Sequence, residues 1–422
     1  MQAKEETMKR EILAMSVIVS LAAAAQPSFV VPDRIYASVG HECNVYFANV
    51  FDSATPWAYA YEALCERGRH ERHRWCWTPK KEDAGTSKQL VLRAIDDSGL
   101  VAAVTTTVTV AELADKTKPV SMAILSASLV NCGYPRKIFE DMRQNGFAMF
   151  KSVGTRDARK AAAGGKPLPV EGSRDDIPFH DGYGGWTFNS FLTRYEMSDD
   201  EISKVQSEAE RQQLLSMGVR LAPEQAWRLP MSKSPFIRIE NGKKVLDVQM
   251  WLDKVNGGRP PEVIVITLGI NGTFGPRDEH ELAKMVDEFQ VPNAKELLAL
   301  LRGACPNSVI GLGTPYVGCS QDGFAENYGC LQSSVQFRHN VFYLARALMR
   351  FAAESGDARL FVMPVGMAID PMESYPKREV PAHARSMRKV WRDVNALHPS
   401  EDGGWQVADA IVSFILGHWS EL

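Results

Sequence analysis

The run Val263 to Leu268 (VIVITL) contains no charged residue and no turn-forming residue. A strand with one solvated face alternates apolar and polar residues, whereas a continuous apolar run indicates a strand buried on both faces. Such strands belong to parallel sheets whose two faces are covered by helices. The flanking sequence must therefore supply helices, and this requirement constrains the fold more than any other feature.

The sequence on both sides of this run meets that requirement, because apolar runs alternate with stretches of helical periodicity. Strands are predicted over 122–125, 147–153, 309–313 and 360–365, and helices over 135–144, 281–302, 333–353 and 405–416. The helical pattern of 281–302 is interrupted near Val291-Pro292. Strand–helix alternation predicts an α/β fold, a doubly wound parallel sheet with helices on both faces. Residues 155–239 are less regular, with one helical segment over 199–217.

The N-terminal part has a different pattern. Short runs rich in β-branched and aromatic residues occupy 34–37, 43–50, 57–64, 73–78, 89–95 and 101–110, with turn signals between them. This spacing predicts a small all-β sandwich, immunoglobulin-like, over residues 26–113. The polar segment 112–119 (ELADKTKP) then separates it from an α/β domain over residues 120–422.

The first residues are typical of an export signal. Lys9 and Arg10 precede an apolar run from Ile12 to Ala25, which ends in small residues. This order indicates a signal peptide over residues 1–25 and a secreted or periplasmic protein. A buried N-terminal helix is the alternative. No other stretch is long and apolar enough for a bilayer, so we expect no membrane association after signal removal.

Composition excludes several classes of function. A net charge of −3 and an isoelectric point near 6.3 give no footprint for nucleic acid, and the basic run from Arg67 to Arg74 is short and interrupted by Glu71. Seven cysteines leave at least one unpaired, and the rest are either disulfides or buried free thiols. None has metal-ligand spacing, so we expect no metal and no cofactor.

A candidate nucleophile and a candidate base lie far apart in the chain. Ser128 follows the first strand of the α/β part, where ligands of such sheets collect. Ser126 is a rival in the same tripeptide. A serine needs a base to take its proton, and His398 lies in a loop directly before the last predicted helix. An imidazole with a pKa near neutrality suits that role.

Acyl transfer also needs hydrogen-bond donors for the developing oxyanion. Asn271 follows the VIVITL strand, at the same predicted sheet edge as Ser128, although Asn-Gly is also a turn signal. Gly185 lies in the glycine-rich segment 182–187 (GYGGWT), whose alternative interpretation is a flexible loop. The nearby aromatic residues Tyr183, Trp186 and Phe188 would suit stacking on sugars or packing in a core.

Together these segments resemble the SGNH, or GDSL-type, hydrolase superfamily, in particular a bacterial subgroup with an N-terminal β-sandwich. The resemblance covers residues 120–422 and rests on Ser126-Ala127-Ser128-Leu129, on GYGGWT, on Gly269-Ile270-Asn271-Gly272 and on Asn395-Ala396-Leu397-His398-Pro399. It implies a flavodoxin-like sheet, Ser128 as nucleophile, His398 as base, and Gly185 and Asn271 as oxyanion donors.

Three acids of the family pattern are absent. Ala127 and Gly272 replace two supporting aspartates, and Asn395 replaces the one three residues before the histidine. That last acid normally orients the imidazole and stabilises its charged form. Asn395 is therefore a candidate for the orienting role through its amide, and Asp393 is a second candidate with unusual spacing.

Two functions from different classes follow. The first is an exported serine esterase, by family analogy an acetylesterase acting on O-acetylated carbohydrate, with a small-molecule or polysaccharide ester as its partner. The second is a catalytically weak or inactive relative that binds glycans or serves in surface assembly. The missing acids motivate the second hypothesis.

Overall fold

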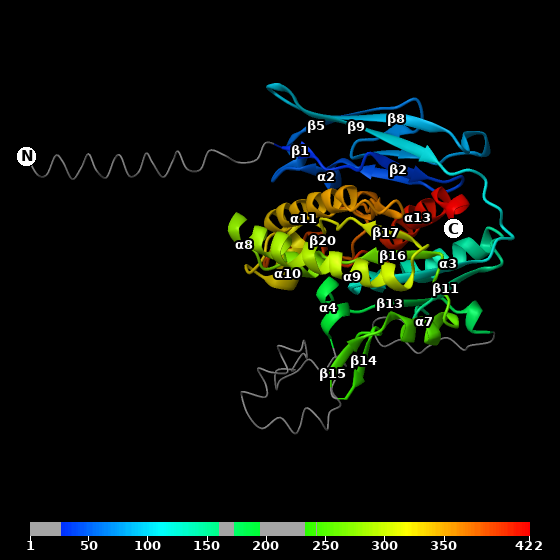
Figure 1. Ribbon diagram of the computed structural model, residues 1–422. Coiled ribbons are helices and arrows are strands. Elements are labelled where there is room, and N and C mark those ends of the chain that lie inside the picture. Colours follow the sequence, from blue (N-terminus) through cyan, green and yellow to red (C-terminus); the bar gives the residue numbers. More distant parts are fainter. Residues whose placement is uncertain (1–26, 160–172, 195–232, 242) are drawn as a thin grey trace, which may run out of the picture.

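The computed structural model describes residues 27–159, 173–194, 233–241 and 243–422 (Figure 1). The predicted signal peptide and the predicted helix over 199–217 lie outside these residues. Within the described ranges, no helix combines the length and the hydropathy needed to cross a bilayer.

The centre of the α/β part is a sheet whose principal strands run parallel. Its order is β12-β13-β10-β16-β17-β18, and β11 also pairs with β10. The strands are β10 (Val120–Ser126), β11 (Phe150–Val153), β12 (Arg156–Asp157), β13 (Phe179–Gly182), β16 (Val263–Thr267), β17 (Val309–Gly313) and β18 (Leu360–Met363). Only β12 is antiparallel to its neighbour among these pairs. The predicted parallel sheet is confirmed.

Both faces of this sheet are buried. Neighbouring residues of a strand point to opposite sides, so a strand covered on both faces contributes alternate residues to two apolar clusters. In β16, Val263 and Val265 belong to one apolar cluster, while Ile264 and Ile266 belong to another. Helices α3 (Tyr134–Gln144) and α13 (Glu401–Gly417) contribute to the first cluster, and α7 (Val248–Asn256) and α9 (Val291–Ala304) to the second. This two-sided burial explains the continuous apolar run of β16.

The remaining helices match the sequence pattern only in part, since no helix was predicted over 321–328 or 365–368. They are α4 (Phe188–Thr193), α8 (Glu279–Ala283), α10 (Gln321–Tyr328), α11 (Ser334–Glu354) and α12 (Val365–Ala368). The break expected near Val291-Pro292 is wrong. A π-helical segment (Lys284–Gln290) joins α8 to α9 without a gap, and Pro292 lies in the first turn of α9, where its missing N–H costs nothing.

The N-terminal part contains three small sheets. A four-stranded sheet has the order β2-β9-β8-β5, a three-stranded sheet β3-β7-β6, and β1 pairs with β4. Their bounds are β1 (Ser28–Phe29), β2 (Arg34–Ala37), β3 (Cys43–Tyr46), β4 (Phe51–Asp52), β5 (Ala60–Leu64), β6 (Arg69–His70), β7 (Arg74–Trp77), β8 (Ser87–Asp96) and β9 (Gly99–Val110). The strand expected over 43–50 is wrong in its second half, which is the short helix α2 (Phe47–Val50). All four residues of α2 are buried.

Buried polar contacts join the N-terminal sheets to the helices of the α/β part. His41 Nε2 lies 2.8 Å from Asp141 Oδ2, and Ser38 Oγ lies 2.9 Å from Ser413 Oγ. The Asn49 amide donates to the carbonyl of Gly366 over 3.0 Å. In Figure 1 the N-terminal strands lie along α11 and α13, while α4 and α7 lie on the far side of the central sheet. The N-terminal part therefore covers the outer surface of one helical layer.

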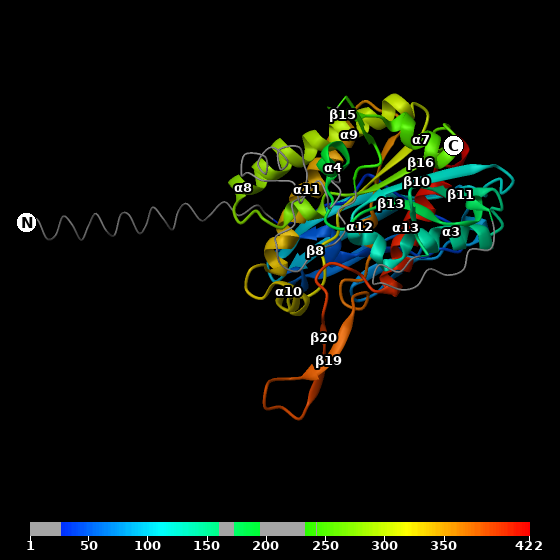
Figure 2. The ribbon, with the colours of Figure 1, turned by 90° about the horizontal axis from the view of Figure 1, so that it is seen from below.

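Two hairpins extend from the α/β part. One consists of β14 (Ile237–Glu240) and β15 (Lys243–Leu246), and the other of β19 (Lys377–Pro381) and β20 (Lys389–Asp393). Figure 2 shows that the β19–β20 hairpin projects well beyond the body of the protein.

All seven cysteines lie in described residues and all are free thiols. Five of them are buried: Cys43, Cys76, Cys132, Cys305 and Cys319. Of the two alternatives, the structure has buried thiols rather than disulfides.

Candidate active site

Three of the four predicted segments begin where adjacent parallel strands end. Leu125 and Ser126 of β10 pair with the last two residues of β13, and Ser126 also pairs with Thr267, the last residue of β16. The segments with Ser128, Gly185 and Asn271 therefore leave the same edge of the sheet from neighbouring strands. Since β10 lies between the other two, Ser128 follows the central strand of the three.

The two serines of the first segment have different environments. Ser126 is fully buried, and its Oγ accepts a 2.7 Å hydrogen bond from the Thr267 hydroxyl, which itself lies 2.9 Å from the hydroxyl of Tyr134. Ser128 is partly exposed and begins a 3₁₀ helix (Ser128–Cys132), and no described residue hydrogen-bonds to its Oγ. Ser126 is thus engaged in a structural network, whereas the Ser128 hydroxyl has no competing hydrogen bond within the described residues.

The turns that carry the two candidate oxyanion donors are joined by a hydrogen bond. The Asn271 amide donates a 2.9 Å hydrogen bond to the carbonyl of Trp186, the residue after Gly185. Gly185 is exposed and has a φ of 74°, a conformation that favours glycine. An amide nitrogen carries two hydrogens, so one remains available on Asn271 after this bond. The hydrogen bond from Asn271 to Trp186 fixes the glycine-rich turn relative to the Asn271 turn.

A buried carboxylate that the sequence analysis did not single out supports the same turn. Asp181 is fully buried at the end of β13 and accepts hydrogen bonds of 2.9 Å from the Tyr183 hydroxyl and from the indole of Trp251. The Thr155 backbone N–H donates to it over 3.2 Å. Burial raises the pKa of Asp181 above its usual value, against these bonds. The available signal was an acid directly before the glycine-rich segment, in the sequence FHDG.

His398 reaches this edge through the packing of the last helix. The first turn of α13 lies against the 3₁₀ helix that begins with Ser128. A side chain at Gly404 would overlap the carbonyl oxygen of Cys132, so glycine is required there for this approach. The buried Lys137 also binds Glu401, the first residue of α13, at 3.0 Å. His398 lies three residues before α13 and is therefore held on the side of the sheet edge where Ser128 lies.

The loop around His398 is ordered through its backbone. Asn395 Oδ1 accepts hydrogen bonds from the backbone N–H groups of His398 (2.8 Å) and Leu397 (3.1 Å). Asn395 makes no hydrogen bond to the imidazole, and within the described chain His398 Nε2 is buried without a hydrogen-bond partner. The hydrogen bond between Ser128 and His398 is accordingly not formed in this structure. Burial lowers the pKa of His398, which keeps the imidazole neutral and able to accept a proton.

Asp393, the other candidate to orient the histidine, is engaged elsewhere. Its Oδ2 accepts hydrogen bonds from the hydroxyl and the backbone N–H of Ser320. It makes no hydrogen bond to His398. Neither of the two candidate residues therefore contacts the imidazole in this structure.

At Gly272, where the SGNH pattern has an acid, the space for a side chain is filled. A Cβ atom at Gly272 would overlap Nε2 of Gln290, the last residue of the π-helical segment. Gln290 is fully buried, and neither polar atom of its amide has a partner among the described residues. Buried amides without partners are rare and costly, and π-helical segments are frequent at functional sites. No signal in the sequence pointed to Gln290.

The aromatic side chains beside the site are part of the core. Tyr183, Trp186 and Phe188 are all buried, and the rings of Tyr183 and Trp186 stack with centroids 4.0 Å apart. The idea that these rings stack on sugars is therefore wrong. Their role is to pack the turn that carries Gly185.

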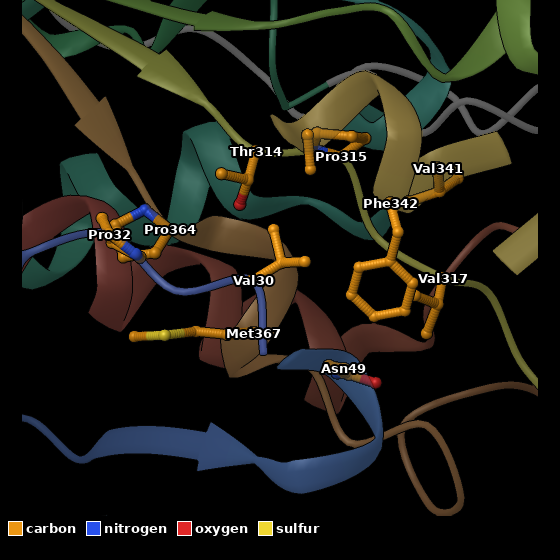
Figure 3. Close-up of a pocket in the computed structure, with 11 residues that line it drawn as sticks. Val30, Pro32, Asn49, Thr314, Pro315, Val317, Val341, Phe342, Pro364 and Met367 are labelled. Carbon is orange, nitrogen blue, oxygen red and sulfur yellow. The ribbon is translucent and has the colours of Figure 1, made fainter. Parts of the chain in front are cut away.

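A small cavity lies away from these segments, between the N-terminal part and helices α11 and α12. Figure 3 shows Val30, Asn49, Phe342 and Met367 around it. Its volume of about 20 Å³ is too small for an ester of a sugar, and none of the four segments lines it. We do not assign the site to this cavity.

Comparison with known proteins gives no family assignment. No protein-family model matches the chain, and no curated protein matches it. Similar solved structures include a carbohydrate esterase family 3 from Talaromyces cellulolyticus, with 12% identity and a TM-score of 0.38 over 72% of this chain and 99% of that chain. A Clostridium thermocellum family 3 carbohydrate esterase aligns with 11% identity and a TM-score of 0.35 over 72% and 98%. A possible lipase from Chitinophaga pinensis aligns with 11% identity and a TM-score of 0.32 over 70% and 97%. We draw no functional conclusion from alignments this loose, and the proposal that follows depends on the geometry of the site.

Proposed function

We propose that this protein is a serine esterase of the SGNH type, with Ser128 as nucleophile and His398 as general base. The observation that carries the proposal is the convergence of Ser128, Gly185 and Asn271 at the ends of three adjacent strands, with the Gly185 and Asn271 turns joined by a hydrogen bond. A nucleophile beside two preorganised donors is the arrangement that acyl transfer needs.

In the proposed reaction, Ser128 Oγ attacks the carbonyl carbon of the ester while His398 Nε2 takes the hydroxyl proton. The negative charge on the carbonyl oxygen is stabilised by the N–H of Gly185, the free amide hydrogen of Asn271 and the N–H of Ser128. The C–O bond to the alcohol then breaks, and the alcohol leaves with the proton from His398. Water, deprotonated by His398, releases the acid and restores Ser128.

The first step requires His398 to approach Ser128, since the two side chains do not form a hydrogen bond without substrate. Such bonds are often long in free enzymes and shorten when substrate binds. The role of base is supported by the neutral Nε2 of His398, because it has no hydrogen bond to a described residue that must break before it accepts a proton.

The proposal extends to the whole chain. We propose a doubly wound, flavodoxin-like hydrolase domain over residues 120–422, a β-sandwich over 26–113 and an export signal over 1–25, with O-acetylated carbohydrate as substrate. The buried contacts between the two parts, such as His41 with Asp141, support one integral unit rather than two mobile domains. The substrate class rests on family analogy.

Hydrolysis of 4-nitrophenyl acetate by the full chain tests the proposal. We expect turnover by the wild type, and its loss in Ser128→Ala. Ser126→Ala is the matched control, because it removes a hydroxyl from the buried network two residues away. Equal rates for wild type and Ser128→Ala would reject Ser128 as nucleophile.

The second candidate function is a glycan-binding or surface-assembly protein without esterase activity. One observation favours it, namely that no described residue orients the imidazole of His398 by a hydrogen bond. A protein of this kind would bind O-acetylated oligosaccharide without releasing acetate. The hydrolysis of 4-nitrophenyl acetate described above separates the two functions, because only the esterase would hydrolyse this ester.

A further inference from the structure

The β19–β20 hairpin projects from the protein and carries an unusual set of side chains (Figure 2). Between residues 377 and 392, positive charge greatly exceeds negative charge, although the whole chain has a net charge of −3. The basic residues are Lys377, Arg378, Arg385, Arg388, Lys389 and Arg392, against Glu379. Cations are thus concentrated on one projecting element.

The strand register divides the hairpin into two faces. Arg378 lies opposite Arg392, so two like charges face each other on one side, an arrangement that destabilises a hairpin on its own. Helix α10 offsets this repulsion, because Glu326 lies 2.9 Å from Arg378 and Asp322 lies 4.0 Å from Arg392. This face is therefore the anchored face.

The opposite face, named the free face below, makes no ion pair with α10 in the described part of the chain. Trp391 lies opposite Glu379 on this face and is 67% exposed, although a tryptophan normally buries most of its apolar surface. Lys389 lies on the same face, two residues away, and contacts Glu379 at 3.3 Å. An exposed indole next to a cation on a strand surface offers a stacking platform with a charged neighbour.

The turn of the hairpin continues this surface. Met387 is 98% exposed, and Arg385 and Arg388 flank it. Neither arginine forms an ion pair with any carboxylate in the described part of the chain, whereas the four cations on the strands all do. The cations at the turn are therefore available to an anionic partner.

The hairpin leads directly to the candidate active site. β20 ends at the buried Asp393, and the backbone N–H of Val394 binds the carbonyl of Pro376 at 2.9 Å, which closes the base of the hairpin. His398 follows five residues after the end of β20. A polymer bound along the free face would thus be tethered near the catalytic histidine.

We propose that the β19–β20 hairpin is a binding arm for an acidic polysaccharide, with Trp391 stacking on a sugar ring and Arg385 and Arg388 binding its carboxylates. The proposal rests on the proposed function, since it names an anionic, acetylated polymer as the substrate class. Charge complementarity favours a polyanion, and the flat position of Trp391 favours a sugar ring over a lipid headgroup.

The test is binding of the full chain carrying Ser128→Ala to polygalacturonate, compared with its methyl-esterified form, which has the same backbone without the charges. We expect binding to polygalacturonate only, and a loss of affinity of about tenfold in Trp391→Ala and in the double variant Arg385→Ala/Arg388→Ala. Trp57→Ala and Arg72→Ala are matched controls, because both residues are exposed in the N-terminal part, and neither should change the affinity.

Three results would overturn this proposal. The first is that the hairpin variants bind polygalacturonate as tightly as the parent chain with Ser128→Ala, and the second is that the control variants lose as much affinity as the hairpin variants. The third is binding to phosphatidylglycerol vesicles but not to polygalacturonate. Hydrolysis of 4-nitrophenyl acetate by the chain with Ser128 intact is measured separately. Absence of hydrolysis rejects the esterase, while absence of polymer binding rejects the arm, so the two failures are distinguishable.

Discussion

The two halves of the candidate site differ at the positions where the resemblance to the SGNH pattern would place an acid, Gly272 and Asn395. On the proposed oxyanion side, Gln290 occupies the space that a side chain at Gly272 would need, and the turns of Gly185 and Asn271 are joined by a hydrogen bond. On the histidine side, Asn395 has the shape of an aspartate and holds the loop through backbone N–H groups, while His398 Nε2 has no hydrogen-bond partner among the described residues.

At the first position a buried neighbour fills the space, so a larger side chain fits only if Gln290 moves. At the second, an amide of the same shape as aspartate orders the loop, so an acid can be introduced there without a change of volume. In the proposed mechanism the oxyanion side is preorganised, and the nucleophile–base side closes when substrate binds. Four predictions test this contrast.

The largest effect is expected for Ser128→Ala. Removal of the nucleophile should lower kcat for an acetyl ester by at least about 10³-fold, because only the oxyanion donors and binding would remain. Ser126→Ala should retain activity and lose only stability, measured by urea denaturation. Activity that depends on Ser126 instead would place the nucleophile in the buried network and contradict the assignment.

Asn271→Ala should lower kcat by about 10²-fold with little change in KM, since an oxyanion donor acts mainly in the transition state. Steady-state kinetics on 4-nitrophenyl acetate measures both constants. A rise in KM at constant kcat would mean that Asn271 binds the ground state, and the oxyanion side would not be preorganised as we infer.

Gly272→Asp should destabilise the fold by about 1–3 kcal/mol, because the new side chain and Gln290 compete for the same space. Urea denaturation measures the loss. In a double-mutant cycle, Gln290→Ala should relieve most of it, since the two sites are in contact. Independent, additive effects of the two substitutions would show that Gln290 does not fill the space of the acid.

The smallest effect is expected on the histidine side. Burial lowers the pKa of His398, and the base must be neutral, so kcat/KM should stay constant through neutral pH and fall only below pH 6.5. Asn395→Asp keeps both hydrogen bonds to the backbone and adds a negative charge near the imidazole, so it should raise the pKa of His398. The fall of kcat/KM should then begin at a higher pH, with kcat changed only a few-fold.

Asn395→Ala is the control for that experiment, because it removes the acceptor for the two backbone N–H groups and should reduce kcat at every pH. An unchanged pH profile in Asn395→Asp would mean that a charge at this position does not change the pKa of His398. The loop would then serve only to place His398.

Much of the fold was predictable from local patterns. The VIVITL run predicted a strand buried on both faces, and β16 has this property because its alternate residues join two clusters. Prediction failed where a local pattern has two solutions. The apolar stretch 43–50 continues as α2, whose four residues are all buried, and burial alone does not distinguish a short helix from a strand.

The sequence by itself indicated which residues carry the candidate chemistry and that Ser128 and Asn271 follow strands at one edge of a parallel sheet, because strand alternation and residue type are local properties. Only the tertiary structure decided that the glycine-rich segment follows a strand beside that of Ser128, that Ser126 is buried in a hydrogen-bond network, that Asn271 binds Trp186, that the nearby aromatic rings are buried and that Gln290 fills the space at Gly272. Each of these depends on which side chain from a distant segment reaches a given position. Asp181, Gln290 and the projecting β19–β20 hairpin became interpretable for the same reason, since burial, unpartnered atoms and exposure are properties of the assembled chain.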